Sequence, residues 1–261
     1  MSPAQRSVPL LLRHWDAIRS QIQQSPRVVV FLDFDGTLVR IAPRPELVRI
    51  AASTRGVLSR LARHKRVRVA IVSGRRRAEL LHHIALPHIH YLGLYGWEGH
   101  SNSAIPVTTQ VALSRAHKLL HAKLAAYRSV WIEPKKNTLS VHLLGAAADV
   151  QNRVRRELRT LINPFRGQLR LLENLRDVEV IPLAIEGKGA AVTKILQKPT
   201  LQKAFPIYFG DDLSDEPAFA AVRGRGAGIL VGKSRRTNAR FRLRTPADVT
   251  AALTRLEAAL A

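Results

Sequence analysis

Two carboxylates stand two positions apart, directly after a run of apolar residues. Residues 28–32 are all apolar, which predicts a short, fully buried strand, and Asp33 and Asp35 follow it. Period-two spacing places both acids on the same face of an extended backbone, and Gly36 then allows a sharp turn. Like charges this close repel each other, so we expect a cation or a shared proton between them. The stretch predicts a metal-assisted site.

Two further motifs carry groups that suit a bound phosphate. Ser73-Gly-Arg75 follows a predicted strand, and Lys188 opens a predicted helix after Gly187. A phosphate dianion needs hydrogen-bond donors and a positive charge. Ser73 offers a hydroxyl and the N–H groups of a helix N-terminus, and Lys188 offers a point charge. These residues therefore predict a phosphate-binding site.

A second group of acids follows another predicted strand, in the order Gly210-Asp211-Asp212-x-x-Asp215. Together with Asp33, the Asp211 and Asp212 carboxylates would supply the oxygen ligands that Mg²⁺ prefers. Whether Asp212 or Asp215 contacts the metal directly stays open at this point. Asp33 is also free to act as a carboxylate nucleophile.

Strands and helices alternate at both ends of the chain, which predicts an α/β fold with a doubly wound parallel sheet. The expected strands are residues 28–32, 67–72, 91–95, 207–209 and 228–231, and the expected helices are 3–25, 46–64, 76–84, one beginning near 187, and 246–260. Pro43 and Pro45 mark a loop between the first strand and the second helix.

In the middle of the chain, the predicted elements no longer alternate strictly but follow the order α-β-β-α-β-β. Helices are expected at 109–126 and 146–162, and strands at 130–133, 139–143, 169–172 and 178–181. This order predicts a smaller α+β domain inserted into the parallel one. The expected organisation is an N-terminal helical extension (1–26), a discontinuous core (27–103 and 183–261) and an inserted cap (104–182).

The ordered set of motifs resembles the haloacid-dehalogenase-like phosphohydrolases, over nearly the whole chain. The resemblance implies that Asp33 attacks phosphorus and forms an aspartyl phosphate, while Asp35 serves as general acid and then general base. It implies Mg²⁺ held by Asp33, the backbone carbonyl of Asp35 and the pair Asp211 and Asp212. The phosphoryl group would be held by Ser73, Lys188, Gly36 and Thr37.

Within that superfamily the chain is most similar to the trehalose-6-phosphate phosphatase family. The similarity rests on residues 32–38 and 210–216, Gly96-x-Glu98, Glu133-x-Lys135 followed by His142, and Glu179-x-x-Pro182. It implies hydrolysis of trehalose 6-phosphate under a cap that closes over the sugar, with substrate contacts from Arg75, Glu98, Glu133, Lys135 and Glu179. Carboxylates accept hydrogen bonds from sugar hydroxyls and a lysine donates to them, so these residue types suit that role.

The chain departs from the family pattern at two positions. Ser214 stands where the family usually has Thr, and Leu144 stands where an arginine commonly follows the His142 strand, which leaves one cap contact open. No synthase domain precedes the phosphatase motifs, so the expectation is a stand-alone enzyme. Another sugar phosphate, such as sucrose phosphate or a glycosyl-glycerate phosphate, is the alternative substrate.

The chain of 261 residues carries a formal net charge of +23 and no cysteine. Without cysteine, disulfides and thiolate metal sites are excluded, and the absence of a long apolar run favours a soluble, cytoplasmic protein without membrane contact. We expect a monomer. The basic charge favours an anionic substrate or solvated helix faces. A nucleic-acid-binding protein is the alternative from a different class, because residues 233–244 hold six basic side chains.

Two weaker patterns resemble a phosphate-binding loop and a metal site. Residues 227–234 nearly match a phosphate-binding P-loop, but Ala227 replaces the first glycine and the Ile-Leu-Val run favours a strand. The histidines His82, His83, His88 and His90 lie on and after a helix without ligand-like acids, which favours surface histidines over a metal site.

Overall fold

A computed structural model describes residues 8–42, 44, 47–99 and 104–260 of the chain. The chain divides into two compact units, one formed by Met1–Ser101 with Glu186–Ala261 and the other by Asn102–Ile185. Each unit has its own hydrophobic core.

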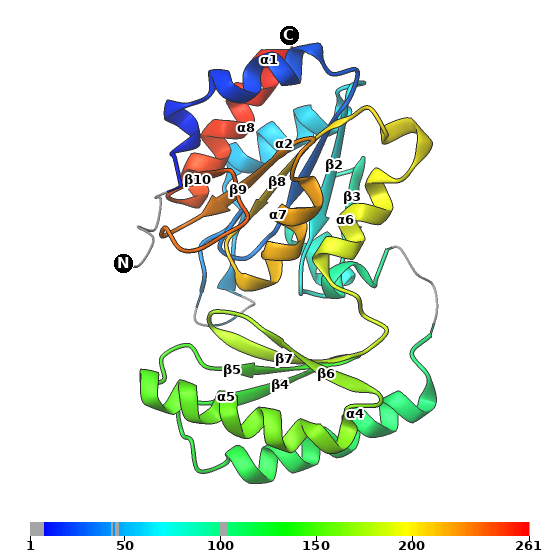
Figure 1. The fold of residues 1–261 in the computed structure, drawn as a ribbon, viewed down its shortest axis with the longest axis vertical. Coiled ribbons are helices and arrows are strands. Elements are labelled where there is room, and N and C mark those ends of the chain that lie inside the picture. The colour runs from blue at the N-terminus through cyan, green and yellow to red at the C-terminus, as the bar shows by residue number, and fades with distance from the viewer. Residues whose placement is uncertain (1–7, 43, 45–46, 100–103, 261) are drawn as a thin grey trace. The chain divides into compact units, whose positions relative to one another are not determined.

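The first unit is built on a sheet of six strands in the order β10-β9-β8-β1-β2-β3, and every neighbouring pair is parallel (Figure 1). The order runs outward from β1 in both directions, which is the doubly wound arrangement. Its strands are β1 (Val28–Leu32), β2 (Val67–Val72), β3 (Ile89–Leu92), β8 (Phe205–Gly210), β9 (Ala227–Val231) and β10 (Phe241–Leu243).

The central strands are apolar throughout because both faces of this sheet are covered. Alternate residues of β1 enter two different cores: Val28, Val30 and Leu32 pack on one face, and Val29 and Phe31 on the other. The first face is covered by α1 (Asp16–Gln24), α2 (Ala52–Arg63), α3 (Arg77–Ile84) and α8 (Pro246–Leu260). The second face is covered by α6 (Lys188–Leu196) and α7 (Glu216–Val222).

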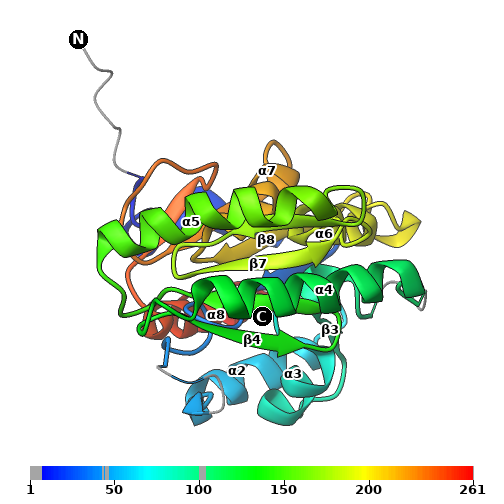
Figure 2. The same cartoon turned by 90° about the horizontal axis from the view of Figure 1, so that it is seen from below.

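The second unit is a four-stranded antiparallel sheet in the order β4-β5-β7-β6 with both of its helices on one face (Figures 1 and 2). Its elements are α4 (Val107–Leu124), β4 (Trp131–Lys135), β5 (Thr138–His142), α5 (Ala148–Ile162), β6 (Leu169–Glu173) and β7 (Asp177–Pro182). Leu139, Val141, Val178 and Val180 point into the core beneath α4 and α5. The opposite face of the sheet is therefore left for polar side chains.

The α/β class, the doubly wound parallel sheet and the separate α+β unit are confirmed. Several element bounds are wrong. The helix predicted at 3–25 begins only at Asp16 within the described residues, after a short 3₁₀ turn (Leu11–Arg13), and residues 3–7 lie outside them. The helix predicted at 46–64 begins at Ala52, and Pro43, Pro45 and residue 46 lie outside the described residues.

The third strand is shifted from residues 91–95 to Ile89–Leu92, because a 3₁₀ turn (Leu94–Gly96) follows it. In that turn Leu94 and Tyr95 have positive φ angles of 46° and 59°, which no strand allows. The P-loop-like residues 227–231 form strand β9, as their apolar run indicated. Among the described residues, no helix combines the length and apolarity that crossing a membrane requires.

Candidate active site

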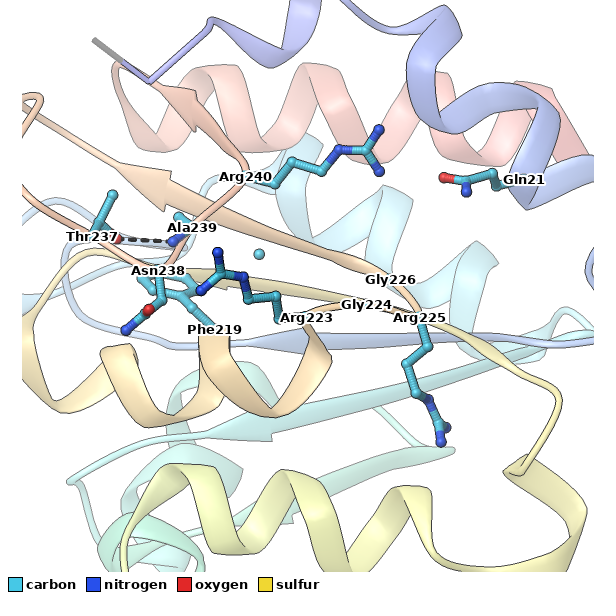
Figure 3. A pocket seen from close by; sticks show the side chains of 11 residues that line it. Gln21, Phe219, Arg223, Gly224, Arg225, Gly226, Thr237, Asn238, Ala239 and Arg240 are labelled. Carbon is cyan, nitrogen blue, oxygen red and sulfur yellow. Dashed lines mark hydrogen bonds between the residues drawn. The ribbon is translucent and has the colours of Figure 1, made fainter. Parts of the chain in front are cut away.

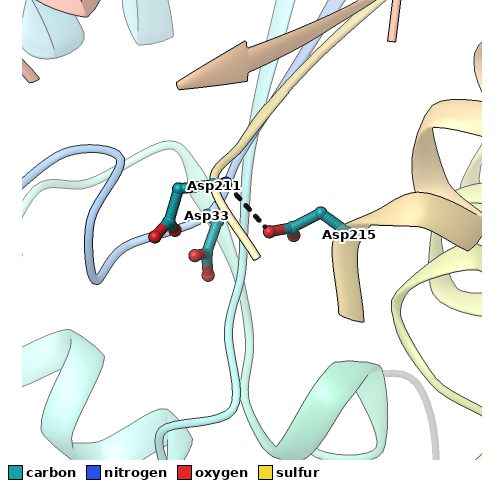
Figure 4. A group of neighbouring side chains, drawn as sticks. All are labelled: Asp33, Asp211 and Asp215. Carbon is teal, nitrogen blue, oxygen red and sulfur yellow. Dashed lines mark hydrogen bonds between the residues drawn. The ribbon is translucent and has the colours of Figure 1, made fainter. Parts of the chain in front are cut away.

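Three buried aspartates meet at one edge of the parallel sheet. Asp33 follows β1 and Asp211 follows β8, and these two strands are direct neighbours in the sheet. Asp215 closes the short 3₁₀ turn Leu213–Asp215 that comes next in the chain (Figure 4). One carboxylate oxygen from each aspartate lies within 4.8 Å of the others. The carboxyl ends of parallel strands are where such folds bind ligands.

Lys188 supplies the positive charge inside this group. Its Nζ lies 2.9 Å from Asp33 Oδ1 and 2.8 Å from Asp215 Oδ1, and all three side chains are buried. Burial alone would lower the pKa of Lys188, but Asp215 and Asp33 outweigh it and raise that pKa. The lysine is therefore fully charged. Gly187, with φ of 108°, turns the chain so that Lys188 becomes the first residue of α6.

Burial and neighbouring charges act together on the carboxyl group of Asp33. Burial raises the pKa of Asp33 well above its usual range, and the charges of Asp215 and Asp211 raise it further, although Lys188 opposes them. A cation bound beside these carboxylates would favour their charged forms.

Asp215 is the structural centre of the group. Its Oδ1 accepts hydrogen bonds from Lys188 Nζ at 2.8 Å and from Tyr208 Oη at 2.6 Å. Its Oδ2 accepts from the backbone N–H groups of Asp211 and Asp212, at 3.0 and 2.8 Å. A carboxylate has about four acceptor positions, so these donors leave Asp215 little capacity for a metal. It holds the loop that presents Asp211.

Two glycines allow the loops to approach this closely. A Cβ atom on Gly36 would lie 2.1 Å from Asp211 Oδ2, and one on Gly210 would lie 2.4 Å from the carboxyl carbon of Asp215. Gly36 also has φ of 83°, which favours glycine. Any side chain at Gly36 would fill the space beside the Asp211 carboxylate.

Asp35 is paired with Arg75 rather than with the buried aspartates. The guanidinium donates from Nε to Oδ2 at 2.6 Å and from Nη2 to Oδ1 at 2.8 Å. Arg75 also lies 5.4 Å from the ring centre of Phe34 and 3.5 Å from His83 Nε2. Burial, together with the Arg75 charge, lowers the pKa of His83. Arg75 was predicted to contact substrate, and that role stays a prediction.

The other predicted phosphate ligands lie on neighbouring loops. Ser73 follows β2, next to β1 in the sheet, and its Oγ accepts from the Arg75 N–H at 3.2 Å. The Thr37 hydroxyl lies 3.4 Å from Asp211 Oδ1 and is directed to that carboxylate. Glu98, predicted to contact sugar, accepts from the backbone N–H of Arg77 at the start of α3. The structure thus gives Glu98 a helix-capping role beside the predicted one.

An arginine that the sequence analysis did not single out stabilises the acidic loop. Arg235 donates to the carbonyl oxygens of Asp211 and Asp212, at 3.3 and 2.8 Å, and forms an ion pair with Glu216. Glu216 also accepts from the Asn238 N–H at 2.7 Å. Residues 235–238 therefore stabilise the loop that contains Asp211 and Asp212. Tyr208 was missed as well; its position one residue before Phe209 in the apolar strand marked it only as core.

Three of the predicted substrate contacts, Glu133, Lys135 and Glu179, lie in a polar row on the second unit. Glu133, Ser140 and Glu179 are register partners across β4, β5 and β7, so their side chains share the face opposite the helices. Lys135 Nζ contacts Glu179 Oε1 at 2.6 Å, and His142 Nε2 lies 2.8 Å from Glu133 Oε2. Burial opposes the charge of Lys135, but Glu179 and Glu133 outweigh it and raise its pKa.

Three oxygens of this face are buried and have no hydrogen-bond partner among the described residues: Thr138 Oγ1, Ser140 Oγ and Glu179 Oε2. Buried polar atoms in native proteins are almost always paired, and unpaired ones call for an explanation. A ligand rich in hydroxyl groups would satisfy them. Trp131 stacks on His142 with a centroid distance of 3.8 Å at the end of the row and adds a flat aromatic surface.

The residues of the first unit fit a divalent cation. Asp33 and Asp211 provide buried carboxylate oxygens, which suit Mg²⁺, and the pKa of Asp33 is raised by burial first and then by the charges of Asp215 and Asp211. Asp212 follows β8 and caps the next turn through Leu213 N–H at 2.6 Å. The saturated bonding of Asp215 favours Asp33 and Asp211 as the direct ligands.

Comparison with known proteins agrees with this geometry. A family model described as trehalose-phosphatase matches residues 31–247. The chain is 30% identical to the trehalose 6-phosphate phosphatase RA3 of Zea mays, covering 88% of this chain and 70% of that protein. It is 33% identical to the trehalose-phosphate phosphatase of Mycobacterium marinum, covering 86% of this chain and 60% of that one.

Solved structures show the same fold. The C-terminal domain of a Candida albicans trehalose-6-phosphate phosphatase superposes with a TM-score of 0.81 at 20% identity, covering 98% of this chain and 99% of that one. A sucrose-phosphatase from Synechocystis superposes with a TM-score of 0.54 at 16% identity, covering 88% and 98%. The family match and the relatives together show that this chain belongs to the trehalose-phosphatase family.

Proposed function

We propose that the protein is a Mg²⁺-dependent phosphatase that hydrolyses trehalose 6-phosphate to trehalose and phosphate through an aspartyl phosphate. The observation that carries the proposal is the buried group of Asp33, Lys188 and Asp211 at the carboxyl edge of the sheet, in a member of the trehalose-phosphatase family. The first unit would perform the chemistry, and residues 104–182 would select the sugar.

Asp33 is the proposed nucleophile. Its carboxylate oxygen attacks phosphorus as the bond from phosphorus to the sugar oxygen breaks, and Asp35 gives its proton to that leaving oxygen. Asp35 then takes a proton from water, whose oxygen attacks phosphorus and releases Asp33 and phosphate. Held by Asp33 and Asp211, with the carbonyl of Asp35, Mg²⁺ would neutralise the phosphoryl oxygens and favour ionised carboxylates.

The ion pair of Arg75 with Asp35 gives this proposal a further step. Both carboxylate oxygens of Asp35 accept hydrogen bonds from the Arg75 guanidinium, whereas a general acid must face the leaving oxygen of the substrate. The phosphoryl group of the substrate would compete with Asp35 for the guanidinium. Arg75 would then bind substrate, as the sequence indicates, and Asp35 would become available for proton transfer.

The second unit offers the chemistry for a disaccharide. Glu133 and Glu179 would accept hydrogen bonds from sugar hydroxyls, and Lys135 would donate to them. The unpaired buried oxygens of Ser140 and Glu179 support a polar ligand on this face. A cytoplasmic monomer without membrane or nucleic-acid partners is part of the proposal, and it rests on composition.

The test is an assay of phosphate release from trehalose 6-phosphate, sucrose phosphate and a glycosyl-glycerate phosphate, with Mg²⁺ and with a chelator. We expect preference for trehalose 6-phosphate and no activity in the chelator. Equal rates on the three esters would overturn the substrate, and full activity in the chelator would overturn the metal.

The nucleophile is tested with Asp33→Asn. An amide is a poor nucleophile and a poorer metal ligand, so we expect turnover to fall by several orders of magnitude. Retained activity above about one part in a hundred of the wild-type rate would contradict the covalent route. Circular dichroism of the variant shows whether the fold is intact.

A further inference from the structure

A second candidate binding site lies in the first unit, away from the aspartates. It is a pocket of about 340 Å³ beside the N-terminal ends of β9 and β10 (Figure 3). Asp33 and Asp211, by contrast, follow the C-terminal ends of β1 and β8. The pocket is lined by Gln21, Phe219, Arg223, Gly224, Arg225, Gly226, Gly228, Thr237, Asn238, Ala239 and Arg240.

The lining is strongly cationic. It contains Arg223, Arg225 and Arg240 and no aspartate or glutamate. In the described part of the chain, no ion pair involves any of these three arginines. The Glu216 carboxylate forms an ion pair with Arg235 and accepts a hydrogen bond from the Asn238 N–H. The pocket therefore presents positive charge that no described acid offsets.

The arginines differ in how they lie. Arg225 extends away from the other two and donates to the carbonyl of Leu201 at 3.2 Å. The Arg223 side chain points toward Asn238 and Thr237, and the Arg240 side chain points the other way, toward Gln21 (Figure 3). The Arg240 backbone is fixed by its N–H bond to the carbonyl of Gly228 at 2.8 Å. Arg223 follows directly after helix α7. A guanidinium group presents a planar set of donors that suits a phosphate oxyanion.

We propose that this pocket binds the phosphate group of a small organic phosphate ester through its arginine side chains, with Arg223 and Arg240 as the candidate ligands. Guanidinium donors pair well with phosphate oxygens. A bare phosphate ion would fill only a fraction of the volume, because one water takes about 30 Å³ in the liquid. Phe219, Thr237 and Asn238 provide an apolar floor and polar atoms for the rest of the ligand. The site is separate from the proposed phosphatase chemistry.

The test uses glycerol 3-phosphate as the probe and Asp33→Asn as the background, with a chelator present, so that turnover and metal-dependent binding are removed. Amide shifts of ¹⁵N-labelled protein locate the probe. We expect saturable shifts at Gly224, Gly226 and Thr237, and none with glycerol. Because only binding is measured in an inactive variant, the result does not depend on the substrate of the phosphatase.

Adding Arg223→Gln and Arg240→Gln removes both proposed ligands, and we expect affinity to fall about tenfold or more. The matched control adds Arg19→Gln and Arg63→Gln, which remove the same charge from exposed positions of the first unit and should change affinity less than about twofold. Three results would each overturn the site: no saturable shifts up to about 10 mM probe, shifts confined to residues 33–37 and 211–215, or an equal loss in the control. Equal loss would indicate general attraction of polyanions such as nucleic acid.

Discussion

At the scale of single residues, the site depends on how one lysine is shared. Lys188 lies between Asp33 and Asp215, and its buried charge is matched by theirs. Removing one member of a buried ion pair leaves the other charges uncompensated, which costs far more than the pair contributes as a whole. Lys188 therefore supports the fold as well as the proposed phosphate site.

We predict that Lys188→Met lowers the free energy of unfolding by about 3–5 kcal/mol in the presence of a chelator. Lys194→Met is the matched control, because Lys194 lies on the same helix and forms an exposed pair with Glu186. That variant should lose at most about 1 kcal/mol. Urea unfolding of both variants measures the difference, and similar losses would contradict the buried role.

The acidic residues of this site could be identified from the sequence, but their individual roles could not be distinguished there. Asp33 and Asp211 were recognisable because each follows an apolar strand. Whether Asp212 or Asp215 binds metal was left open, since the spacing of the motif fits either. Tyr208 and two backbone N–H groups bond Asp215, which bears on that choice, and such contacts appear only once the strands are assembled.

At the scale of elements, the segment between β9 and β10 acts on the acidic loop through Arg235. This side chain reaches the carbonyl groups of both Asp211 and Asp212. Groups that orient metal ligands from the next layer commonly change metal affinity by about 10–100-fold when removed. Arg235 is a positioning residue in this sense.

We predict that Arg235→Gln raises the Mg²⁺ concentration for half-maximal activity by about tenfold or more. The neighbouring Arg236 is exposed, so Arg236→Gln removes the same charge and should leave that concentration unchanged. Activity titrated with Mg²⁺ for both variants makes the comparison. A shift of equal size in Arg236→Gln would attribute the effect to charge alone.

In the second unit, Arg155 and Arg159 of α5 both form ion pairs with Glu173 of β6. We call this arrangement the clamp. Burial raises the pKa of Glu173, but the hydrogen bonds from Arg159 and Arg155 outweigh it, so the pKa is lowered. A lowered carboxyl pKa stabilises the fold above the unfolded-state pKa of about 4.3. That stabilisation is lost as the pH falls through the folded-state pKa.

We therefore expect Glu173→Gln to flatten the decline of unfolding free energy between about pH 5 and about pH 3. Urea unfolding followed across that range measures the slope. Replacing Arg155 and Arg159 with Gln together should flatten it in the same way, because the donors that lower the pKa are gone. An unchanged slope in both variants would rule out the clamp as the cause.

The elements that sequence reasoning missed are those with weak local patterns. Strand β10 has three residues, Phe241-Arg242-Leu243, within a basic segment, and only pairing with β9 makes it a strand. Helix α7 has seven residues and follows the acidic motif without a clear periodic face. By contrast, the bounds of β1 and β2 were predicted correctly, because a run of five or six mainly apolar residues specifies a buried strand.

At the scale of the whole molecule, the charge of +23 should act on the rate of substrate capture. A field of one sign attracts an anionic substrate over several ångströms, and salt screens it. We predict that kcat/KM for trehalose 6-phosphate falls severalfold as ionic strength rises from about 0.01 M to about 0.15 M, while kcat stays constant. Steady-state kinetics in NaCl test this, and an unchanged kcat/KM would show that the charge is only a solvated surface.

The central strand β1 has a consequence for how the protein folds. It pairs on one side with β2, close in the chain, and on the other with β8, so that Val28 lies beside Phe205. Until β8 has been synthesised and docked, β1 has an open apolar edge of the kind that joins other chains. Contacts so distant in sequence form slowly. Newly made chains therefore depend on protection of that edge while the second unit, which lies between the two strands in the chain, is completed.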